Sequence, residues 1–134
     1  MKNSIIFVSK LGLLLIREKS KFCNSIFLAE IDGAYIRTEE EFVREMDNAF
    51  HVPYKDSPLR FGYWNDHMHD LMWIEQRDIV LLIRNYDQLL NEDIQLKERI
   101  IEQLNDIILP WWEYDVVGHM VGGEARRFNV YISR

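Results

Sequence analysis

The chain has 134 residues, of which 48% are hydrophobic, and its formal net charge is -6. This length and composition predict one folded domain with a hydrophobic core rather than a disordered chain. The acidic balance argues against nucleic acid as the main ligand, because phosphate contacts need clustered Lys and Arg, and it favours a basic protein partner. The single cysteine, Cys23, cannot form an internal disulfide, so we expect a reducing compartment, the cytoplasm.

Residues 1–22 form an N-terminal extension whose structure the sequence leaves open. Its apolar stretches, residues 5–8 and 11–16, are interrupted by Lys10 and together are too short for a membrane span. They suit one or two edge strands joined by a turn after Lys10, or equally a helix that starts there. A signal peptide fits poorly because no small-residue cleavage pattern follows the broken apolar run. We therefore expect no membrane partner.

The first strand and helix are predicted between residues 26 and 53. Residues 26–31 form a short apolar run before an Asp-Gly pair, which is typical of a strand that leaves the core through a tight turn. Thr38 and Glu41 then form a capping box, in which hydroxyl and carboxylate each satisfy a backbone donor at a helix start. Pro53 ends this helix. Its apolar residues recur at helical spacing and should be buried: Phe42, Val43, Met46, Ala49 and Phe50.

A second helix is predicted from Asp66 to about Ile74, with Asn65 as its cap after a loop of residues 54–60. Its core-facing side chains should be Met68, Leu71 and Met72. Its outer side collects Asp66, His69, Asp70 and Trp73. Two carboxylates four residues apart stack one turn above the other and repel each other, which suggests that a cationic partner is meant to bind them.

The second half of the chain predicts two further strands and a long helix. Residues 78–83 contain an unbroken apolar run, residues 79–83, which is typical of a parallel strand that is covered on both faces. A helix of about residues 92–109 follows, with Pro110 as its stop. Residues 111–123 are interpreted as a partly ordered connection before a last strand at 127–132. This order of elements predicts an α/β fold with parallel strands and right-handed crossovers.

The sequence Asp66-His67-Met68-His69-Asp70 invites a metal hypothesis, because imidazole and carboxylate both bind zinc or manganese. Residues two apart on a helix diverge by about 200°, so the two histidines do not share one ion unless the segment is a strand or a loop. We therefore expect no metal and no cofactor. A metal-dependent hydrolase that uses Asp66, His67, His69 and Asp70 stays as the alternative function.

Several segments together resemble the barstar family of ribonuclease inhibitors. They are Ile-Asp-Gly-Ala-Tyr-Ile-Arg at residues 31–37, Phe-His-Val-Pro at 50–53, and Phe61-Gly62 followed by Asp66 and Asp70. The resemblance covers about residues 27–86 well and continues loosely through the last helix and the last strand. The order and the spacing of the fragments carry it, because each fragment alone is weak.

The resemblance implies a three-stranded parallel sheet packed with about four helices, formed by residues 23–134. It also implies a non-enzymatic inhibitor, an immunity protein of a bacterial toxin–antitoxin pair, that blocks a basic ribonuclease toxin and acts as a monomer. Asp70 matches the central acidic anchor of the family, Asp66 matches its second acid, and Asp106 or Glu102 matches its acid on the last helix loosely. The expected partner-binding residues are Asp66, Asp70, His69, Trp73, Gly62, Tyr63 and Asp106.

The chain also departs from the family pattern. His69 stands where the family usually has tryptophan, Trp64-Asn65 reverses the usual order, and the loop of residues 54–60 is longer. A further alternative is therefore that the fold is reused as a general interaction module for another basic protein, because a fold does not determine its partner.

Overall fold

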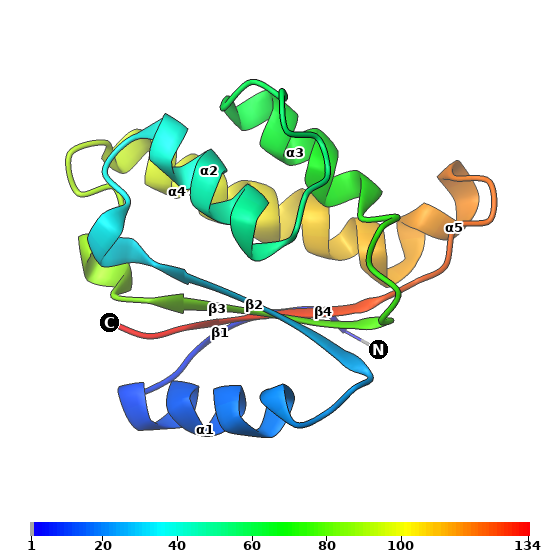
Figure 1. Cartoon of the computed structure of the whole chain (residues 1–134), viewed down its shortest axis with the longest axis horizontal. Coiled ribbons are helices and arrows are strands. Elements are labelled where there is room, and N and C mark those ends of the chain that lie inside the picture. Colours follow the sequence, from blue (N-terminus) through cyan, green and yellow to red (C-terminus); the bar gives the residue numbers. More distant parts are fainter. Residues whose placement is uncertain (1) are drawn as a thin grey trace.

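The computed structural model describes residues 2–134 and is built around one parallel sheet (Figure 1). Its strands are β1 (Ile5–Phe7), β2 (Ile26–Asp32), β3 (Asp78–Arg84) and β4 (Arg127–Ile132). They lie in the order β1-β4-β3-β2, and every neighbouring pair is parallel. The predicted strands at 26–31, 78–83 and 127–132 are thus confirmed, and so is the α/β class.

The central strand β3 is covered on both faces, as its unbroken apolar run predicts. Ile79, Leu81, Leu82 and Ile83 are all buried. Residue by residue, β3 pairs with β2 from Ile26 against Asp78 onward, and with β4 on its other side. Side chains on both faces of a central parallel strand meet helices rather than water, which is why the strand lacks an alternating pattern.

Helices cover the two faces of the sheet unequally (Figure 1). One face carries α2 (Glu39–Ala49), α3 (Phe61–Asp70), α4 (Ile94–Gln103) and α5 (Val116–His119), and the other carries α1 (Lys10–Lys21) alone. The largest fully buried side chains include Trp64, Trp112, Phe42, Phe50 and Phe128. They fill the space between the sheet and the four-helix layer. Within residues 2–134 no helix has the length and apolar character that crossing a membrane requires.

Residues 23–134 contribute the three expected strands, and the sheet gains a fourth, β1, at its edge from the N-terminal extension. Its register places Ile5 beside Val130 and Phe7 beside Ile132. Instead of a second edge strand, α1 follows, and its first turn is capped by Ser9, whose Oγ accepts a hydrogen bond from the Gly12 N–H at 2.9 Å. A three-residue strand is too short to show a two-residue period, so pairing with β4 rather than sequence pattern defines it.

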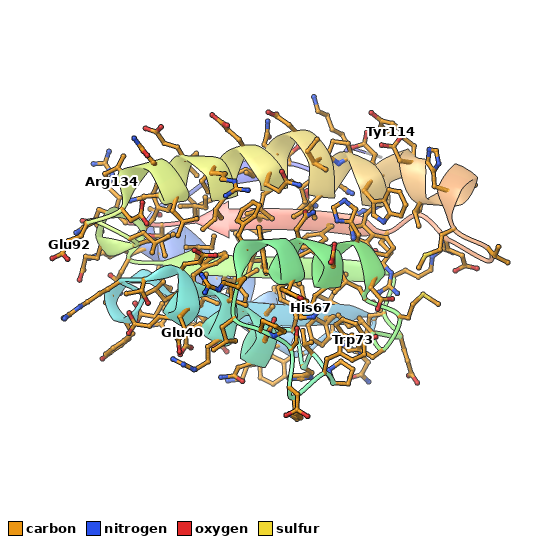
Figure 2. All side chains as sticks on the ribbon, turned by 90° about the horizontal axis from the view of Figure 1, so that it is seen from above. Glu40, His67, Trp73, Glu92, Tyr114 and Arg134 are labelled. Carbon is orange, nitrogen blue, oxygen red and sulfur yellow. The ribbon has the colours of Figure 1, made fainter. Side chains whose placement is uncertain are left out.

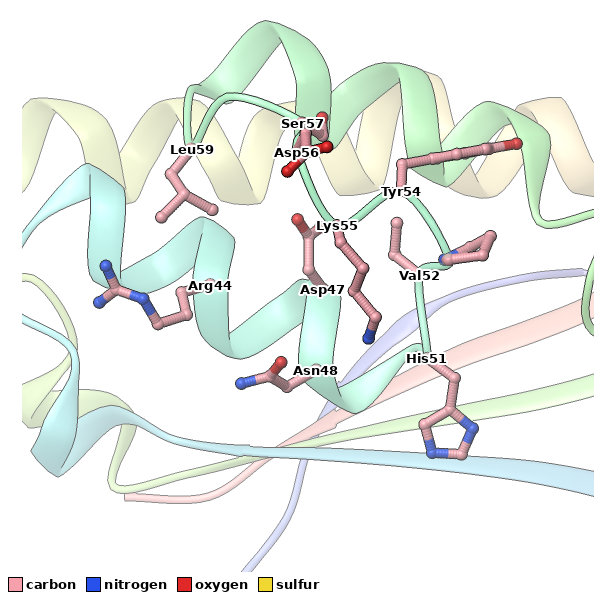
Figure 3. A pocket seen from close by; sticks show the side chains of 11 residues that line it. Arg44, Asp47, Asn48, His51, Val52, Tyr54, Lys55, Asp56, Ser57 and Leu59 are labelled. Carbon is pink, nitrogen blue, oxygen red and sulfur yellow. The ribbon is translucent and has the colours of Figure 1, made fainter.

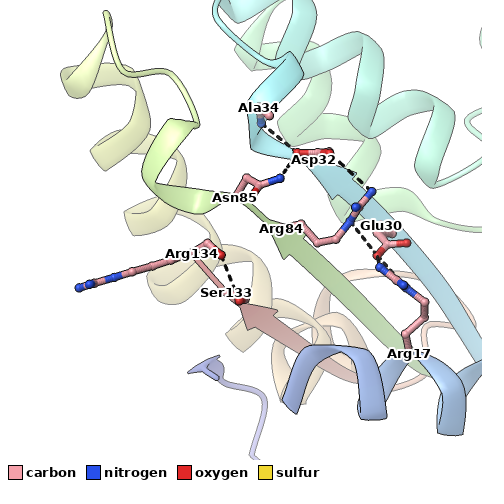
Figure 4. Close-up of polar contacts among 8 residues, drawn as sticks. All are labelled: Arg17, Glu30, Asp32, Ala34, Arg84, Asn85, Ser133 and Arg134. Carbon is pink, nitrogen blue, oxygen red and sulfur yellow. Dashed lines mark hydrogen bonds and ion pairs between the residues drawn. The ribbon is translucent and has the colours of Figure 1, made fainter. Parts of the chain in front are cut away.

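A charged network holds α1 against the ends of β2 and β3 (Figure 4). The Glu30 carboxylate bonds the guanidinium of Arg17 and lies 3.1 Å from Nε of Arg84. The neighbouring Asp32 Oδ1 accepts a hydrogen bond from Nδ2 of Asn85 at 2.8 Å. Two acids and two arginines therefore join three elements, although α1 itself buries little apolar surface.

The start of α2 confirms the predicted capping box. Thr38 Oγ1 accepts a hydrogen bond from the Glu41 N–H at 3.1 Å, and Glu41 Oε1 accepts one from the Arg37 N–H at 3.0 Å. The helix stops before Pro53 with Phe50 as its C-cap, and His51 adopts a positive φ of 56°. The chain thereby turns away from the sheet toward α3.

The second helix begins earlier than predicted. Residue Phe61, not Asp66, is its first residue, and its N-cap Arg60 makes no side-chain cap bond. The carboxylate of Glu39 in α2 instead accepts a hydrogen bond from the Phe61 N–H at 2.8 Å. Because the cap comes from another element, no local signal marks the start, and Asn65 lies inside the helix.

The same helix also ends earlier than predicted. Leu71 has left-handed backbone angles, with φ at 47°, so Met72 and Trp73 lie beyond α3. The predicted core residues Met68 and Leu71 are buried, but Met72 is 60% exposed because the helix no longer directs its side chain.

The helix after β3 does not stop at Pro110. After Asp93 caps α4, helical turns continue through the π-helical segments η3 (Leu104–Ile108) and η4 (Trp111–Asp115) into α5. Proline lacks an N–H and clashes with the preceding turn of an α-helix, whereas the wider π turn, here from the Leu109 N–H to the Leu104 carbonyl, relieves that conflict. The predicted stop is therefore wrong, and the predicted connection at 111–123 is helical as far as His119 and irregular only after it.

Candidate functional site

The acidic pair lies on α3, the helix that stands furthest from the sheet (Figure 1). Seen from above, α3 runs between α2 and α4 (Figure 2). Asp66 is exposed and Asp70, the last residue of the helix, is half-buried. Within the described part of the chain, neither carboxylate has an ion pair. Two like charges one turn apart therefore face water, with a repulsion of a few tenths of a kcal/mol.

Asp70 has one side-chain partner, Tyr54 of the preceding loop. The Tyr54 hydroxyl donates a hydrogen bond to Asp70 Oδ2 at 2.9 Å. This bond raises the pKa of Tyr54, because the carboxylate stabilises the protonated phenol. The Tyr54 ring lies against His67 and Trp73, with centroids 5.5 and 5.7 Å apart. An aromatic wall thus stands beside the carboxylate.

His67, the first histidine of the predicted metal cluster, points inward and is buried. Its Nδ1 lies 3.1 Å from Asp47 Oδ1 on α2, and its Nε2 lies 3.2 Å from Ser57 Oγ in the loop. Burial raises the pKa of Asp47, and the contact with His67 opposes that shift only in part. His67 therefore ties α2, α3 and the loop together.

The contacts of Asp47, His67 and Ser57 follow the order acid, base and hydroxyl that nucleophilic hydrolases use. The His67 side chain is only 6% exposed, so a leaving group does not reach its Nε2 while the loop is in place. We therefore interpret this cluster as structural: it holds the loop against α2 and α3.

His69 occupies a different side of α3 from His67. Its Nδ1 lies 2.7 Å from the carbonyl oxygen of Asn65, and its ring packs 5.3 Å from that of Trp111. No group of three or more His, Cys, Asp or Glu side chains in residues 2–134 is placed to hold a metal ion. The side chains of His67 and His69 therefore contact different groups.

The two tryptophans after Pro110 support α3 from below. Trp112 is buried and its Nε1 donates a hydrogen bond to the Met68 carbonyl at 2.7 Å. Trp111 is half-buried and donates to the His69 carbonyl at 3.1 Å. Both bonds satisfy carbonyl groups in the last turn of α3, so the helix that passes Pro110 fixes the end of the acidic helix.

The remaining predicted partner-binding residues are spread around the acidic pair. Gly62 and Tyr63 are exposed on the first turn of α3, and a Cβ added at Gly62 meets nothing within 4 Å. Trp73 lies beyond the helix, where its Nε1 donates to the Phe50 carbonyl at 2.7 Å. Asp106 is exposed on η3 and accepts a bond from Asn105. The structure thus brings Trp73 and Tyr54 close to Asp70.

The loop of residues 51–60 borders an open cleft of about 590 Å³ beside α2 (Figure 3). Its polar lining includes Arg44, Asp47, Asn48, Lys55, Asp56 and Ser57. Tyr54 extends away from the other labelled side chains of this loop (Figure 3). The sequence predicts a loop here but no role for Tyr54, because a contact between a loop residue and a helix residue sixteen positions later has no local signal.

Comparison with known families gives one match. The family model described as Barstar (barnase inhibitor) matches residues 26–123. The matched span runs from β2 through α5 and leaves out β1, α1 and β4. A search of the curated proteins found no match.

Proposed function

The chain belongs to the barstar family, and on that premise we propose that it inhibits a ribonuclease by placing the carboxylates of Asp66 and Asp70 in the basic site of the enzyme. Members of this family are inhibitors rather than enzymes. In this proposal the chain performs no bond-making step. It occupies positions in the nuclease that otherwise receive the phosphates of RNA.

One observation carries the proposal: two carboxylates that form no ion pair within residues 2–134 lie one turn apart on the outermost helix. A ribonuclease must concentrate Arg and Lys where it binds phosphate. Those cations relieve the repulsion between Asp66 and Asp70 and form charge-assisted hydrogen bonds with them. The net charge of -6 adds a long-range attraction that steers a basic partner toward the chain.

The surroundings of the pair suit a protein interface. Tyr63 is 46% exposed and Trp73 is half-buried, and aromatic side chains of this kind are enriched where partners meet. Around the two acids we place Gly62, Tyr63, His69, Trp73 and Asp106 in the contact surface. We further propose that the chain acts as a monomer in the bacterial cytoplasm and protects the cell that makes the toxin.

Binding of barnase, the enzyme named in the family description, tests the proposal. Calorimetry gives the Kd, and an RNA cleavage assay gives the inhibition. Asp70→Ala should raise the Kd about 100-fold or more, because it leaves the opposing cation buried without a partner. Asp66→Ala should raise it about tenfold, because Asp66 is more exposed and its charge is better solvated.

Glu92→Ala is the matched control, because it removes one exposed carboxylate far from His67 and Trp73 (Figure 2). It should change the Kd by less than about twofold. High salt should slow association of the unaltered chain, because screening weakens steering. Equal binding of the unaltered chain and both aspartate variants, or no inhibition of barnase or of a ribonuclease encoded beside this chain, would contradict the proposal.

A further inference from the structure

Hydrogen bonds at three points hold the loop of residues 51–60 and its first end against α3 and the residues just after it. His67 joins it to α2 through Asp47 and Ser57. Trp73 bonds the Phe50 carbonyl just before the loop begins. Between these two points Tyr54 reaches Asp70. A surface loop that is tied at three points has few conformations left to lose when a partner binds.

Tyr54 is held in place by its neighbours rather than by Asp70 alone. Its ring meets His67 at an interplanar angle of 37° and Trp73 edge-on at 85°. The His67 ring is itself fixed by bonds on both nitrogens. The phenol oxygen is therefore presented at one position, and Asp70 finds a donor there.

Asp70 needs such a donor more than other residues of the helix. It is the last residue of α3, and Leu71 already has left-handed backbone angles, so the helix ends at its Cα. Although the backbone of this last turn is fixed, an aspartate side chain there can exchange rotamers unless another group holds it. The bond to Oδ2 leaves both lone pairs of Oδ1 and one of Oδ2 open for an incoming cation.

We propose that Tyr54 is a positioning residue: it holds the Asp70 carboxylate in the orientation that binds the basic partner, before that partner arrives. The proposal rests on the proposed function for its consequence, although the contact itself exists in the free protein. The cluster of Asp47, His67 and Ser57 sets the loop, the loop sets Tyr54, and Tyr54 sets Asp70.

Nuclear magnetic resonance of the free chain tests the positioning without any partner. Three-bond Hα–Hβ couplings should report a single Asp70 rotamer in the unaltered chain and averaging among rotamers in Tyr54→Phe. The Tyr54 Cζ resonance should titrate at lower pH in Asp70→Asn than in the unaltered chain, because the carboxylate that favours the protonated phenol is gone. Tyr35, a tyrosine of the 3-10 turn after β2 that is 74% exposed, is the control residue for the binding experiment.

Binding of barnase then measures the consequence. Tyr54→Phe should raise the Kd about fivefold through faster dissociation, because the partner must now order the carboxylate itself. In the Asp70→Ala background the same change should have less than about a twofold effect. Tyr35→Phe is the matched control and should leave the Kd unaltered.

The outcomes separate the two proposals. An Asp70 rotamer that is already averaged in the unaltered chain, or equally fixed in Tyr54→Phe, overturns the positioning role even if Asp70→Ala abolishes binding. Equal losses from Tyr54→Phe with and without Asp70 also overturn it, since the hydroxyl then acts independently of the carboxylate. A chain that fails to bind barnase but shows the expected couplings and titration retains the positioning role and loses the proposed function.

Discussion

The two faces of the sheet differ in how much the covering helices bury. The face under α2 to α5 is closed by buried aromatic and aliphatic side chains. The face under α1 is covered thinly: only Leu13 and Ser20 of that helix are buried, whereas Leu11 and Leu15 are 65% and 62% exposed. Phe22, at its end, is 81% exposed. One sheet therefore has a well-packed face with the acidic site and a face held largely by ion pairs.

This difference explains where sequence patterns succeed. An apolar period reports burial only when buried and exposed positions carry different residue types. In α2 they do, and the predicted stripe of Phe42, Val43 and Met46 is buried. In α1 leucine occupies both kinds of position, so the pattern does not separate a helix from a strand.

The largest expected effect comes from a large-to-small substitution in the core of the well-packed face. Trp112→Ala should lower the free energy of unfolding by about 3–5 kcal/mol, because a fully buried indole leaves a cavity and the Met68 carbonyl loses its donor. Urea unfolding followed by circular dichroism measures it. Trp112→Phe, which keeps most of the volume, should cost less and isolates the hydrogen bond. A loss below about 1 kcal/mol for the alanine variant would show that this face is not the better packed one.

The corresponding substitution on the other face should reduce stability less. Leu13→Ala should lower the free energy of unfolding by about 2 kcal/mol, the lower end of the range for leucine, because the neighbouring α1 side chains are free to close the gap. Amide hydrogen exchange should rise in α1 far more than in α3. Comparable increases in both helices would mean that the two faces respond as one unit.

Lowering the pH should change the stability contributions of Asp32 and Asp47 in opposite directions. Burial opposes ionisation of Asp32, but hydrogen bonds from Asn85 and Ala34 and the charge of Arg84 outweigh it and hold its pKa below 3.8. Its contribution to stability is present above pH 3.8 and is lost as the pH falls through the lowered value. Burial raises the pKa of Asp47 above 3.8, so its contribution is present below that pH and is lost as the pH rises through the raised value.

Asparagine variants separate these two contributions. Carboxylates titrate between about pH 3 and pH 6. Over this range the unfolding free energy should rise less with pH in Asp32→Asn than in the unaltered chain. In Asp47→Asn it should rise more. If the slope of unfolding free energy against pH changes in the same direction in both variants, the expected difference between the ion-pair network at α1 and the hydrogen-bonded cluster at His67 is contradicted.

The smallest effect should come from the exposed leucines. Leu15→Ala should alter the free energy of unfolding by less than about 0.5 kcal/mol, because its side chain already faces water and alanine favours helix. It is the size-matched partner of Leu13→Ala on the same helix. A loss equal to that of Leu13→Ala would show that Leu15 is buried in solution.

The sequence carries most of the sheet but only part of the site. Strands β2, β3 and β4 could be predicted because buried parallel strands have continuous apolar runs. The common helix of Asp66 and Asp70 could be predicted because four residues make about one turn. The start of α3 could not, since its cap is a carboxylate of Glu39. The passage through Pro110 could not either, because proline ordinarily stops an α-helix and no local pattern marks the π turns around it.

The bond from the Phe61 N–H to Glu39 has a consequence for attempts to reproduce the acidic pair on a short peptide. A ten-residue helix without its own cap is too short to persist in water, so a synthetic peptide of residues 61–70 should be largely unstructured and should lack the paired acids as a rigid unit. The geometry of the paired acids therefore depends on the rest of the fold. Any engineered miniature would have to carry α2 along with it.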